Sequence, residues 1–363
     1  MQILIMTPWF PTAESWASGR FVAREAAALG AEHDVHVLHL DWQRTSGDPE
    51  PDGPFTLERI ALSRADPFDY LRARRIVAAR AANADVVHTH ALTGLLPWGR
   101  KRPTDRAWVH SEHWSGITAP ATLAPAERMI RRMLLPALGG PDVVVTESRR
   151  LADAVRAHRT GPTVIVPCIV PATVVVDPPR EAVLRIVAVG GLIPRKGPLL
   201  AVQALAHLVG EGCDSHLTWV GDGPERDAML AEASALGVAE RVRLTGVLDD
   251  AGVAAALDAA DIFLLPTQGE NFCVVAAEAL SHGRPIVSGA ETGAVDYADP
   301  QVSVFVAEQT GQAYADAVLA VSAATRDLSA QDIVDTVAGR FTPAAVRAGL
   351  EAAYAMAGVT APR

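Results

Sequence analysis

Two glutamates separated by seven residues are the feature of this sequence best suited to chemistry. Glu270 and Glu278 lie in the segment GENFCVVAAEALSHGRPIV, residues 269–287. A helix beginning near Phe272 would place Glu270 just before it and Glu278 about six residues inside, ~9 Å along the axis. Backbone N–H groups at such a helix start could hold an anion; these would come from Asn271, Phe272, Cys273 and Val274.

The charge of these glutamates indicates their ligands. A carboxylate repels phosphate, whereas paired sugar hydroxyls are suitable donors to it. The expected ~9 Å separation is about the reach from a diphosphate to a ribose within one nucleotide. The pattern therefore predicts one sugar at each carboxylate and a diphosphate between them. The alternative is that Glu270 only favours the positive helix end and that Glu278 is a solvated surface residue.

A basic turn provides the cations that such a site needs. Arg195 and Lys196 follow an apolar strand in VGGLIPRKG and precede a helix from about Pro198. Two cations at a strand-to-helix turn could neutralise a departing diphosphate. A solvated loop tip is the alternative, although Lys196 is one of only two lysines in the chain. Gly221, in VGDGPER, is a weaker ligand-binding candidate and could equally form a tight turn.

The first half of the chain contributes histidines and a glycine. His88, His90, His110 and His113 fall at expected strand ends and invite a zinc interpretation. Their spacings match no standard zinc pattern, so we expect no metal. Gly19 precedes the first expected helix and is a possible approach point for phosphate or sugar.

Composition limits the class of protein. The chain has 363 residues, 49% of them hydrophobic and 20% charged, which indicates a globular protein with a large core. Three scattered cysteines exclude a disulfide framework and favour a cytoplasmic location. The net charge of −10 argues against nucleic-acid binding. No segment is expected to span a membrane, but the basic amphipathic segment 127–138 either touches anionic lipid peripherally or packs on the core.

Alternating apolar runs and helical patterns indicate two α/β domains. Continuous apolar strands of this kind are typical of buried parallel sheets. The proline-rich stretch 164–179 is the expected linker, so we predict domains over 1–170 and 171–342. An amphipathic helix over about 343–358 should pack back across a domain, and periodicity leaves open which one.

Taken together, these segments resemble the retaining glycosyltransferases of family 4. The resemblance covers nearly the whole chain and is strongest over 186–300, where the KG turn, VGDGPER, ADIFLLPT, the paired glutamates and HGRPIV occur in family order. FPTAESWASGRFV, DVVHTHALTG and SEHWSG are similar to acceptor-side segments. The resemblance implies a GT-B fold, in which two doubly wound Rossmann-like domains face each other across a cleft. The first would bind the acceptor and the second a nucleoside-diphosphate sugar.

The resemblance also implies residue roles. Glu270 would bind hydroxyls of the transferred sugar, Glu278 the donor ribose, and the backbone at 271–274 with Lys196 the diphosphate. Arg195 would support this clamp, and His113 would reach the sugar or diphosphate near the reaction centre. No metal or cofactor is implied, and the anomeric configuration is retained. The acceptor hydroxyl could belong to a glycan, a lipid-linked glycan or a small molecule.

Three departures from the family pattern stand out. The common arginine after the first strand of the donor domain is Gly191, and the usual EGFG reads Glu270-Asn271-Phe272-Cys273. The later acid of the family is an aspartate, Asp296. Two other functions therefore stay open at this point: a nucleotide-sugar epimerase on the same fold, and a sugar-nucleotide-binding protein without catalysis.

Overall fold

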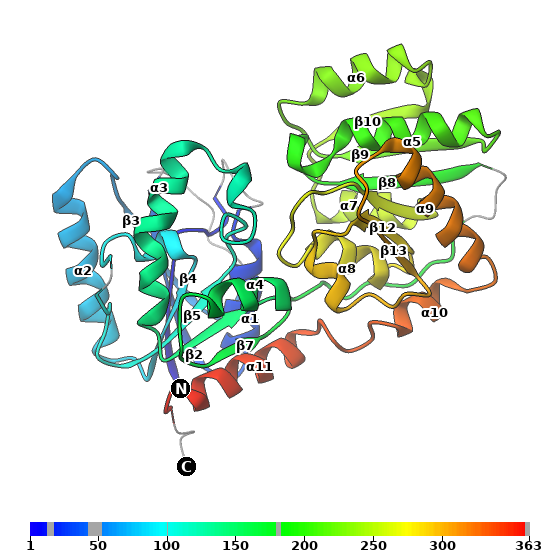
Figure 1. Cartoon of the computed structure of the whole chain (residues 1–363). Coiled ribbons are helices and arrows are strands. Elements are labelled where there is room, and N and C mark those ends of the chain that lie inside the picture. The colour runs from blue at the N-terminus through cyan, green and yellow to red at the C-terminus, as the bar shows by residue number, and fades with distance from the viewer. Residues whose placement is uncertain (13–17, 43–52, 100, 179–182, 360–363) are drawn as a thin grey trace. The chain divides into compact units, whose positions relative to one another are not determined.

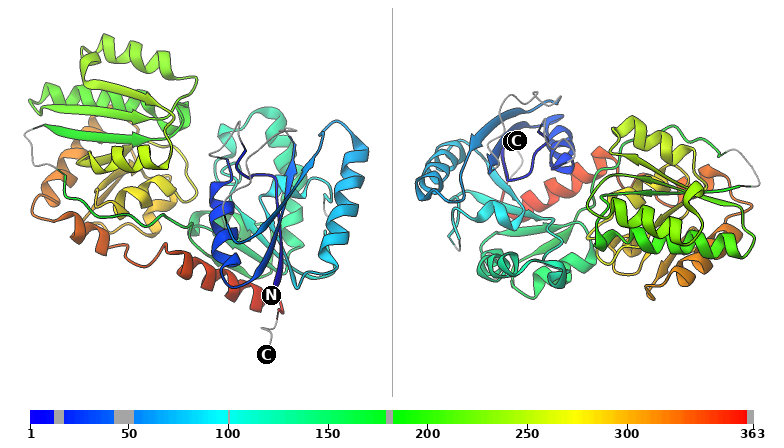
Figure 2. Two further views of the ribbon diagram at one scale, coloured as in Figure 1. Left: turned by 180° about the vertical axis from the view of Figure 1, so that it is seen from behind. Right: turned by 90° about the horizontal axis from the view of Figure 1, so that it is seen from above.

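The chain forms two compact units, each built on a parallel sheet with helices on both faces (Figures 1 and 2). This computed structural model describes residues 1–359 apart from 13–17, 43–52, 100 and 179–182. Unit 1 comprises Met1–Ile169 and Arg340–Arg363, and unit 2 comprises Val170–Gly339. The expectation of two doubly wound α/β units is confirmed.

Unit 1 contains a seven-stranded sheet in the order β3-β2-β1-β4-β5-β6-β7. Its strands are β1 (Gln2–Thr7), β2 (Asp34–Asp41), β3 (Thr56–Ala61), β4 (Val86–His90), β5 (Ala107–Glu112), β6 (Val143–Thr146) and β7 (Thr163–Ile165). Its helices are α1 (Arg20–Gly30), α2 (Pro67–Ala81), α3 (Pro125–Leu134), α4 (Arg149–Arg156) and α11 (Pro343–Met356), with 3-10 turns η1 (Leu92–Leu95), η2 (Pro120–Thr122) and η3 (Leu135–Gly139).

Side-chain alternation along the strands divides the core of unit 1 into two layers. In β1, Ile3 and Ile5 point into the layer that α1 and α11 cover, whereas Leu4 and Met6 point into the opposite layer. The opposite layer packs α2, η3 and α4 on the sheet. Helix α11 therefore belongs to unit 1, where Tyr354 is fully buried beside the strands.

Two expected segments differ in the structure. The helix expected over 127–138 is α3, which ends at Leu134, and η3 continues the chain. Pro136 lies in η3 and lacks the N–H that an α-helix would use there. The expected linker, 164–179, begins inside β7, which pairs with β6. The boundary between the units falls after Ile169, within the expected linker.

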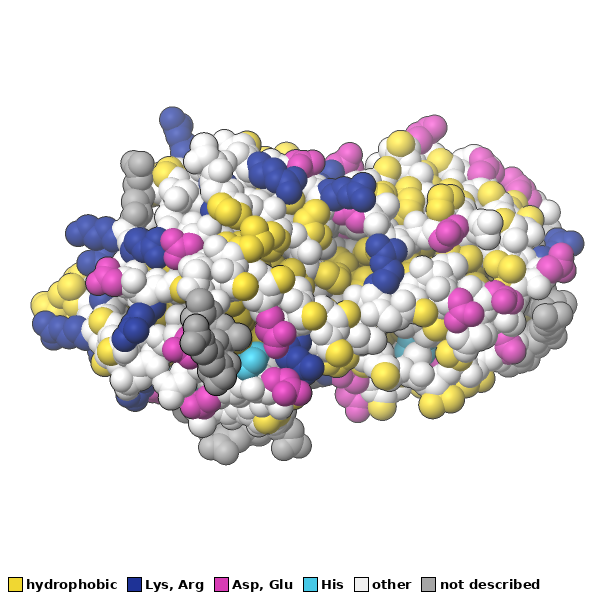
Figure 3. Space-filling model, turned by 90° about the horizontal axis from the view of Figure 1, so that it is seen from below, with side chains coloured by type: hydrophobic (Ala, Val, Ile, Leu, Met, Phe, Trp, Pro, Cys, Tyr) yellow, Lys and Arg dark blue, Asp and Glu magenta, His cyan; other side chains and the backbone are white. Residues whose placement is uncertain are grey.

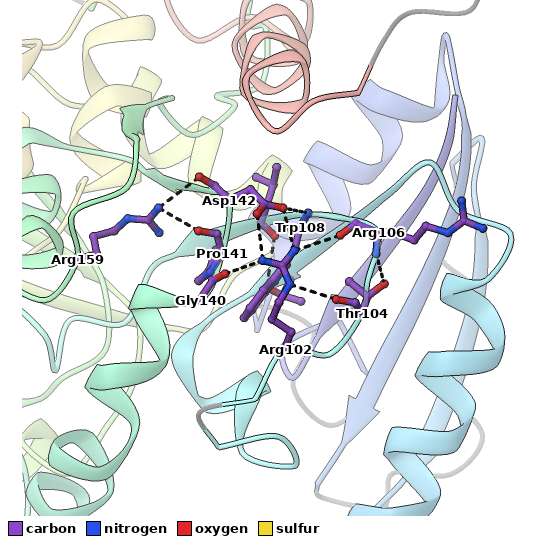
Figure 4. A network of polar contacts seen from close by, with 10 residues as sticks. Arg102, Thr104, Arg106, Trp108, Gly140, Pro141, Asp142 and Arg159 are labelled. Atoms are coloured by element: carbon purple, nitrogen blue, oxygen red, sulfur yellow. Dashed lines mark hydrogen bonds and ion pairs between the residues drawn. The ribbon is translucent and has the colours of Figure 1, made fainter.

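A polar network fixes the loops that precede β5 and β6 (Figure 4). Arg102 donates two hydrogen bonds of 3.0 Å to the carboxylate of Asp142, which also accepts from the backbone N–H of Trp108 at 2.8 Å. Arg159 donates to the carbonyl oxygens of Leu138 and Pro141. These bonds satisfy polar groups at the edge of the sheet opposite to the carboxyl strand ends.

Unit 2 contains a six-stranded sheet in the order β10-β9-β8-β11-β12-β13. Its strands are β8 (Leu184–Val189), β9 (Ser215–Val220), β10 (Val242–Gly246), β11 (Ile262–Leu265), β12 (Ile286–Gly289) and β13 (Ser303–Val306). Its helices are α5 (Pro198–Gly210), α6 (Arg226–Ala235), α7 (Asp250–Asp258), α8 (Val274–Ser281), α9 (Gly311–Ala324) and α10 (Ala330–Asp335), with 3-10 turns η4 (Pro194–Lys196), η5 (Ala239–Arg241) and η6 (Gly293–Asp296).

The strand order of unit 2 creates a switch point. The chain runs outward from β8 to β10 and then returns to β11 on the other side of β8. Because parallel crossovers are right-handed, α5 and α6 cover one face and α7 and α8 the other. The loops after β8 and β11 therefore diverge at the carboxyl edge, where ligands of open α/β sheets usually bind.

Charge is distributed unevenly over the surface. On the face in Figure 3, Lys and Arg side chains gather over unit 1, and few lie over unit 2. An anionic ligand in unit 2 must therefore be held by cations close to it rather than by the overall field. Among the described residues, no helix combines the length and apolar character needed to cross a membrane.

Candidate functional site

The two loops that leave the switch point of unit 2 are joined to each other. The loop after β8 forms η4, which carries Arg195 and Lys196, and the loop after β11 carries Glu270. The backbone N–H of Gln268 donates to the Arg195 carbonyl oxygen at 2.8 Å. The 286–293 segment joins this group, because Glu270 N donates to Glu291 O at 3.0 Å and Gly293 N donates to Glu270 O at 2.9 Å. Three backbone segments thus converge at one edge of the sheet.

Glu270 forms ion pairs with both cations of the basic turn. The Lys196 Nζ lies 2.8 Å from Glu270 Oε1, and the Arg195 guanidinium contacts the same oxygen. The Glu270 side chain is only 16% exposed. Burial alone would raise its pKa, but the charges and hydrogen bonds of Lys196 and Arg195 outweigh burial and lower the pKa of Glu270. The carboxylate is therefore ionised, and this trio has one positive charge in excess.

Helix α8 begins two residues later than the sequence suggests. It starts at Val274, so Glu278 is its fifth residue and lies ~6 Å along the axis from its start. The delay arises at Cys273, whose backbone is left-handed with φ 65°. Asn271, Phe272 and Cys273 are buried, and the Tyr297 hydroxyl donates to the Cys273 carbonyl oxygen at 2.8 Å. Glu278 is half-buried.

Of the three glycines expected to bind the donor, Gly19, Gly191 and Gly221, the two in unit 2 differ in their surroundings. A Cβ at Gly221 would lie 2.1 Å from the Gly190 carbonyl oxygen, so Gly221 is required for the close approach of two strand ends. Gly191 is exposed, and the nearest heavy atom to a Cβ there is the Asp222 carbonyl oxygen at 3.7 Å. The site therefore has space for the arginine that Gly191 replaces.

The histidines of unit 1 lie together at the carboxyl edge of its sheet. His88 is fully buried, and its ring nitrogens contact the Tyr354 hydroxyl at 2.8 Å and Ser111 Oγ at 2.7 Å. His110 contacts Thr89 Oγ1 at 2.8 Å and Glu112 Oε2 at 3.3 Å. Among the described residues, no group of three or more His, Cys, Asp or Glu side chains has the geometry to hold a metal.

His113 and Gly19, in the same unit, both lie in close contact with neighbouring residues. His113 Nδ1 lies 2.8 Å from Glu147 Oε2. The His113 ring packs on the Phe21 ring, and the two ring centroids are 4.4 Å apart. Gly19 caps α1 with φ 71°, and a Cβ there would lie 2.3 Å from the backbone of Trp9. Only glycine fits this approach. The structure thus gives Gly19 a packing role at the start of α1.

Sequence reasoning overlooked Glu25 and Glu147. Both are buried, although glutamate is seldom found in that state. A signal existed for Glu25, because it shares the apolar helical face of Val22 and Leu29. Glu147 directly follows the buried strand β6, which is a typical position for a functional side chain.

Unit 1 also contains a small pocket of about 70 Å³. Trp9, Trp42, His39 and Asp41 are among the residues that line it. The indole Nε1 of Trp42 is buried without a hydrogen-bond partner among the described residues. An indole beside a carboxylate and an imidazole is suited to a polyhydroxylated ring.

Comparison with known proteins identifies the family. Residues 18–173 match the family model described as Glycosyltransferase Family 4, and residues 184–323 match the model described as Glycosyl transferases group 1. The chain belongs to glycosyltransferase family 4. This family 4 enzyme is 27% identical to the D-inositol 3-phosphate glycosyltransferase of Segniliparus rotundus, over 96% of its own length and 86% of that protein. The enzyme of the same name from Xylanimonas cellulosilytica is 31% identical over 58% and 56% of the two chains.

Solved structures share the fold of this family 4 glycosyltransferase. Sucrose-phosphate synthase from Thermosynechococcus elongatus superposes with a TM-score of 0.79 at 20% identity, covering 98% of each chain. Anabaena HepE, solved in complex with UDP, gives a TM-score of 0.74 at 16% identity, over 98% of this chain and 100% of that one. The expected GT-B fold is therefore confirmed.

Proposed function

We propose that this glycosyltransferase moves a sugar from a nucleoside-diphosphate sugar to an acceptor hydroxyl, with retention of configuration and without a metal. The observation that carries the proposal is the pairing of Arg195 and Lys196 with Glu270 at the switch point of unit 2. Two cations beside one carboxylate attract a diphosphate and supply the charge stabilisation that a metal would otherwise provide.

The trio can exchange partners when the donor binds. A diphosphate would compete with Glu270 for Lys196 and Arg195, because it carries more negative charge than one carboxylate. Glu270 would then accept hydrogen bonds from hydroxyls of the transferred sugar. The backbone N–H groups of Cys273 and Val274, at the start of α8, would contribute to the diphosphate site. Glu278, one turn further along, would bind the ribose.

The reaction then needs no nucleophile from the protein. The bond between the anomeric carbon and the diphosphate oxygen breaks, and the acceptor oxygen forms a bond to that carbon on the same face. The hydroxyl proton passes to the departing phosphate oxygen, so atoms and charge balance. Lys196 and Arg195 stabilise the negative charge that develops on the leaving group. His113 is assigned to the reacting sugar or diphosphate through the match of SEHWSG to the family.

The partners of this chain are proposed from its relatives. HepE is described in complex with UDP and with UDP-glucose, which makes UDP the first nucleotide to test. Relatives named for inositol phosphate and 2-deoxystreptamine support a polyhydroxylated acceptor, and a glycan or a lipid-linked glycan fits the same chemistry. Trp9 and Trp42, which line the small pocket of unit 1, are the proposed stacking surfaces for its ring.

We also propose a cytoplasmic location with peripheral contact at the inner face of the membrane. The cysteines at 168, 213 and 273 are free thiols, which suits a reducing compartment. In α3 the side chains of Met129 and Met133 are 62% and 67% exposed, and arginines lie beside them. Exposed apolar groups next to cations are suited to an anionic lipid surface.

A thermal-shift panel tests the proposed donor. UDP, GDP, dTDP and ADP are each added with EDTA and with Mg²⁺. A ligand at a hundredfold its Kd adds about 2.7 kcal/mol, enough for a shift of several degrees. We expect one nucleoside diphosphate to raise the Tm equally with EDTA and with Mg²⁺. A shift that requires Mg²⁺ would overturn metal independence, and no shift with any of the four would overturn the donor site.

A further inference from the structure

Four buried titratable side chains form a row at the carboxyl edge of the unit 1 sheet. Glu147 Oε2 lies 2.8 Å from His113 Nδ1, and His113 Nε2 lies 3.3 Å from His90 Nδ1. The two imidazole rings are nearly parallel, with an interplanar angle of 5° and centroids 5.5 Å apart. His90 Nε2 in turn lies 4.0 Å from Glu25 Oε2. A carboxylate thus stands at each end of a pair of histidines.

The contacts assign the protons along this row. Burial lowers the pKa of His90, and the neighbouring histidines lower it further, so His90 is neutral. Burial also acts against the charge of His113, but the charge and hydrogen bond of Glu147, followed by the charges of Glu25 and Glu112, raise its pKa. A raised pKa favours the cationic form of His113, in which both ring nitrogens carry a proton. In that form Nδ1 faces Glu147 Oε2 and Nε2 faces His90 Nδ1.

The second carboxyl, Glu25, differs from the first. Its Oε2 and the Nε2 of His90 have no hydrogen-bond partner among the described residues. Burial raises the pKa of Glu25 to about 7, with His113 lowering it and Glu147 raising it. Glu25 thus changes charge near neutral pH, whereas Glu147 is tied to His113 by a direct hydrogen bond.

Other titratable groups face this row from the surrounding elements. The Cys168 thiol, after β7, donates to Glu147 at 3.3 Å, and burial together with Glu147 raises its pKa so far that it stays protonated. Burial raises the pKa of Tyr354 in α11, and the charge of Glu25 raises it further, so the Tyr354 hydroxyl is neutral. Burial lowers the pKa of His88 to about 3. The remaining titratable neighbours are Arg24, His110 and Glu112.

We propose that Glu147 is a positioning residue that acts through His113, holding its ring and keeping it cationic, and that Glu25 supports this charge from the other end of the row. The role rests on the proposed function, in which His113 contacts the reacting sugar or diphosphate. The charge of a cationic imidazole there stabilises an anionic leaving group, whereas a neutral imidazole lacks that charge. Cys168 completes the hydrogen bonding of Glu147.

Imidazole NMR of the full chain tests this role without any ligand. The protein is labelled with ¹⁵N-histidine, and His113 is assigned by comparison with His113→Ala. The pH is then varied for the wild type, Glu147→Gln and Glu25→Gln. Glu351→Gln is the matched control, because Glu351 makes a 2.8 Å contact with His33 elsewhere in unit 1. The thermal midpoint of each variant confirms that it is folded.

The expected result is a lower titration midpoint for His113 in Glu147→Gln, by about 1–3 pH units, with a smaller decrease in Glu25→Gln and none in Glu351→Gln. An unchanged His113 midpoint in folded Glu147→Gln would overturn the proposal. If Glu147→Gln does not fold, an unchanged midpoint in Glu25→Gln overturns it instead. Transfer activity of His113→Ala is measured separately, so a failure of the proposed function can be distinguished from a failure of the positioning role of Glu147.

Discussion

Lys196 Nζ and Glu270 Oε1 lie 2.8 Å apart, although 74 residues of chain separate them. Their meeting follows from strand order, because β8 and β11 are neighbours and both loops leave the same edge of the sheet. From the sequence, Lys196 is expected at the diphosphate and Glu270 at the sugar. In the structure the two residues form an ion pair with each other.

Replacing Glu270 should separate donor binding from transfer. Glu270→Gln removes the carboxylate that competes for Lys196 and Arg195, so nucleoside-diphosphate affinity should be unchanged or higher. Transfer should fall by ~10²-fold, because the sugar hydroxyls lose their acceptor. Glu278→Gln should show the opposite pattern, with weaker nucleotide binding. Calorimetry and initial rates measure both; equal loss of nucleotide affinity in the two variants would contradict the assignment.

The Glu270 ion pairs should also appear in the pH dependence of stability. The pKa of Glu270 is lowered in the folded protein, so its stabilising contribution is complete above the unfolded value of ~4.3. It is lost as the pH falls through the lower folded value. Between pH 6 and pH 3, the Tm of the wild type should therefore decrease more than the Tm of Glu270→Gln. Parallel Tm curves for the two proteins would argue against a stabilising ion pair.

Restoring the family arginine at Gly191 should strengthen diphosphate binding. The backbone there does not require glycine, and a Cβ meets no atom closer than 3.7 Å. An added guanidinium should increase nucleoside-diphosphate affinity about tenfold, through a charge-assisted hydrogen bond. Gly191→Gln serves as the uncharged control. An equal gain with glutamine, or no gain with arginine, would show that the missing charge does not limit binding.

Cys273 should tolerate glycine better than valine. Its left-handed backbone, φ 65°, costs a side chain about 1–2 kcal/mol, and a β-branched residue more. Cys273→Gly relieves this strain but loses a buried thiol, so its Tm should stay close to that of the wild type. Cys273→Val places a β-branched side chain on this left-handed backbone and should lose several degrees. Calorimetric scans that gave the same Tm for both variants would contradict this account of the start of α8.

The elements that could be predicted from sequence are those whose burial leaves a local pattern. β1, β8 and β11 are continuous apolar runs because both faces of a parallel sheet are covered. The edge strands β3 and β13 are partly exposed, so their apolar patterns are weaker. The start of α8 was misplaced because the left-handed backbone of Cys273 has no signature in the sequence.

The site residues show the same difference between local patterns and contacts that depend on the fold. Glu270, Lys196 and Arg195 were recognised because each stands in a short motif beside a strand end. The row of Glu25, His90, His113 and Glu147 draws on four separate segments, which only the sheet order brings together. No spacing within one segment could have shown it.

Nucleoside-diphosphate affinity in two lysine variants tests directly whether Lys196 holds the diphosphate at the switch point of unit 2. The chain has two lysines, and Lys101 is an exposed residue of unit 1, so Lys101→Ala is a matched control for Lys196→Ala. Titration calorimetry in EDTA uses the nucleotide that gives the largest thermal shift. We expect that Lys196→Ala weakens binding by about ten- to a hundredfold, while Lys101→Ala binds like the wild type. Unchanged affinity in folded Lys196→Ala would show that the switch point of unit 2 does not hold the diphosphate in the way described.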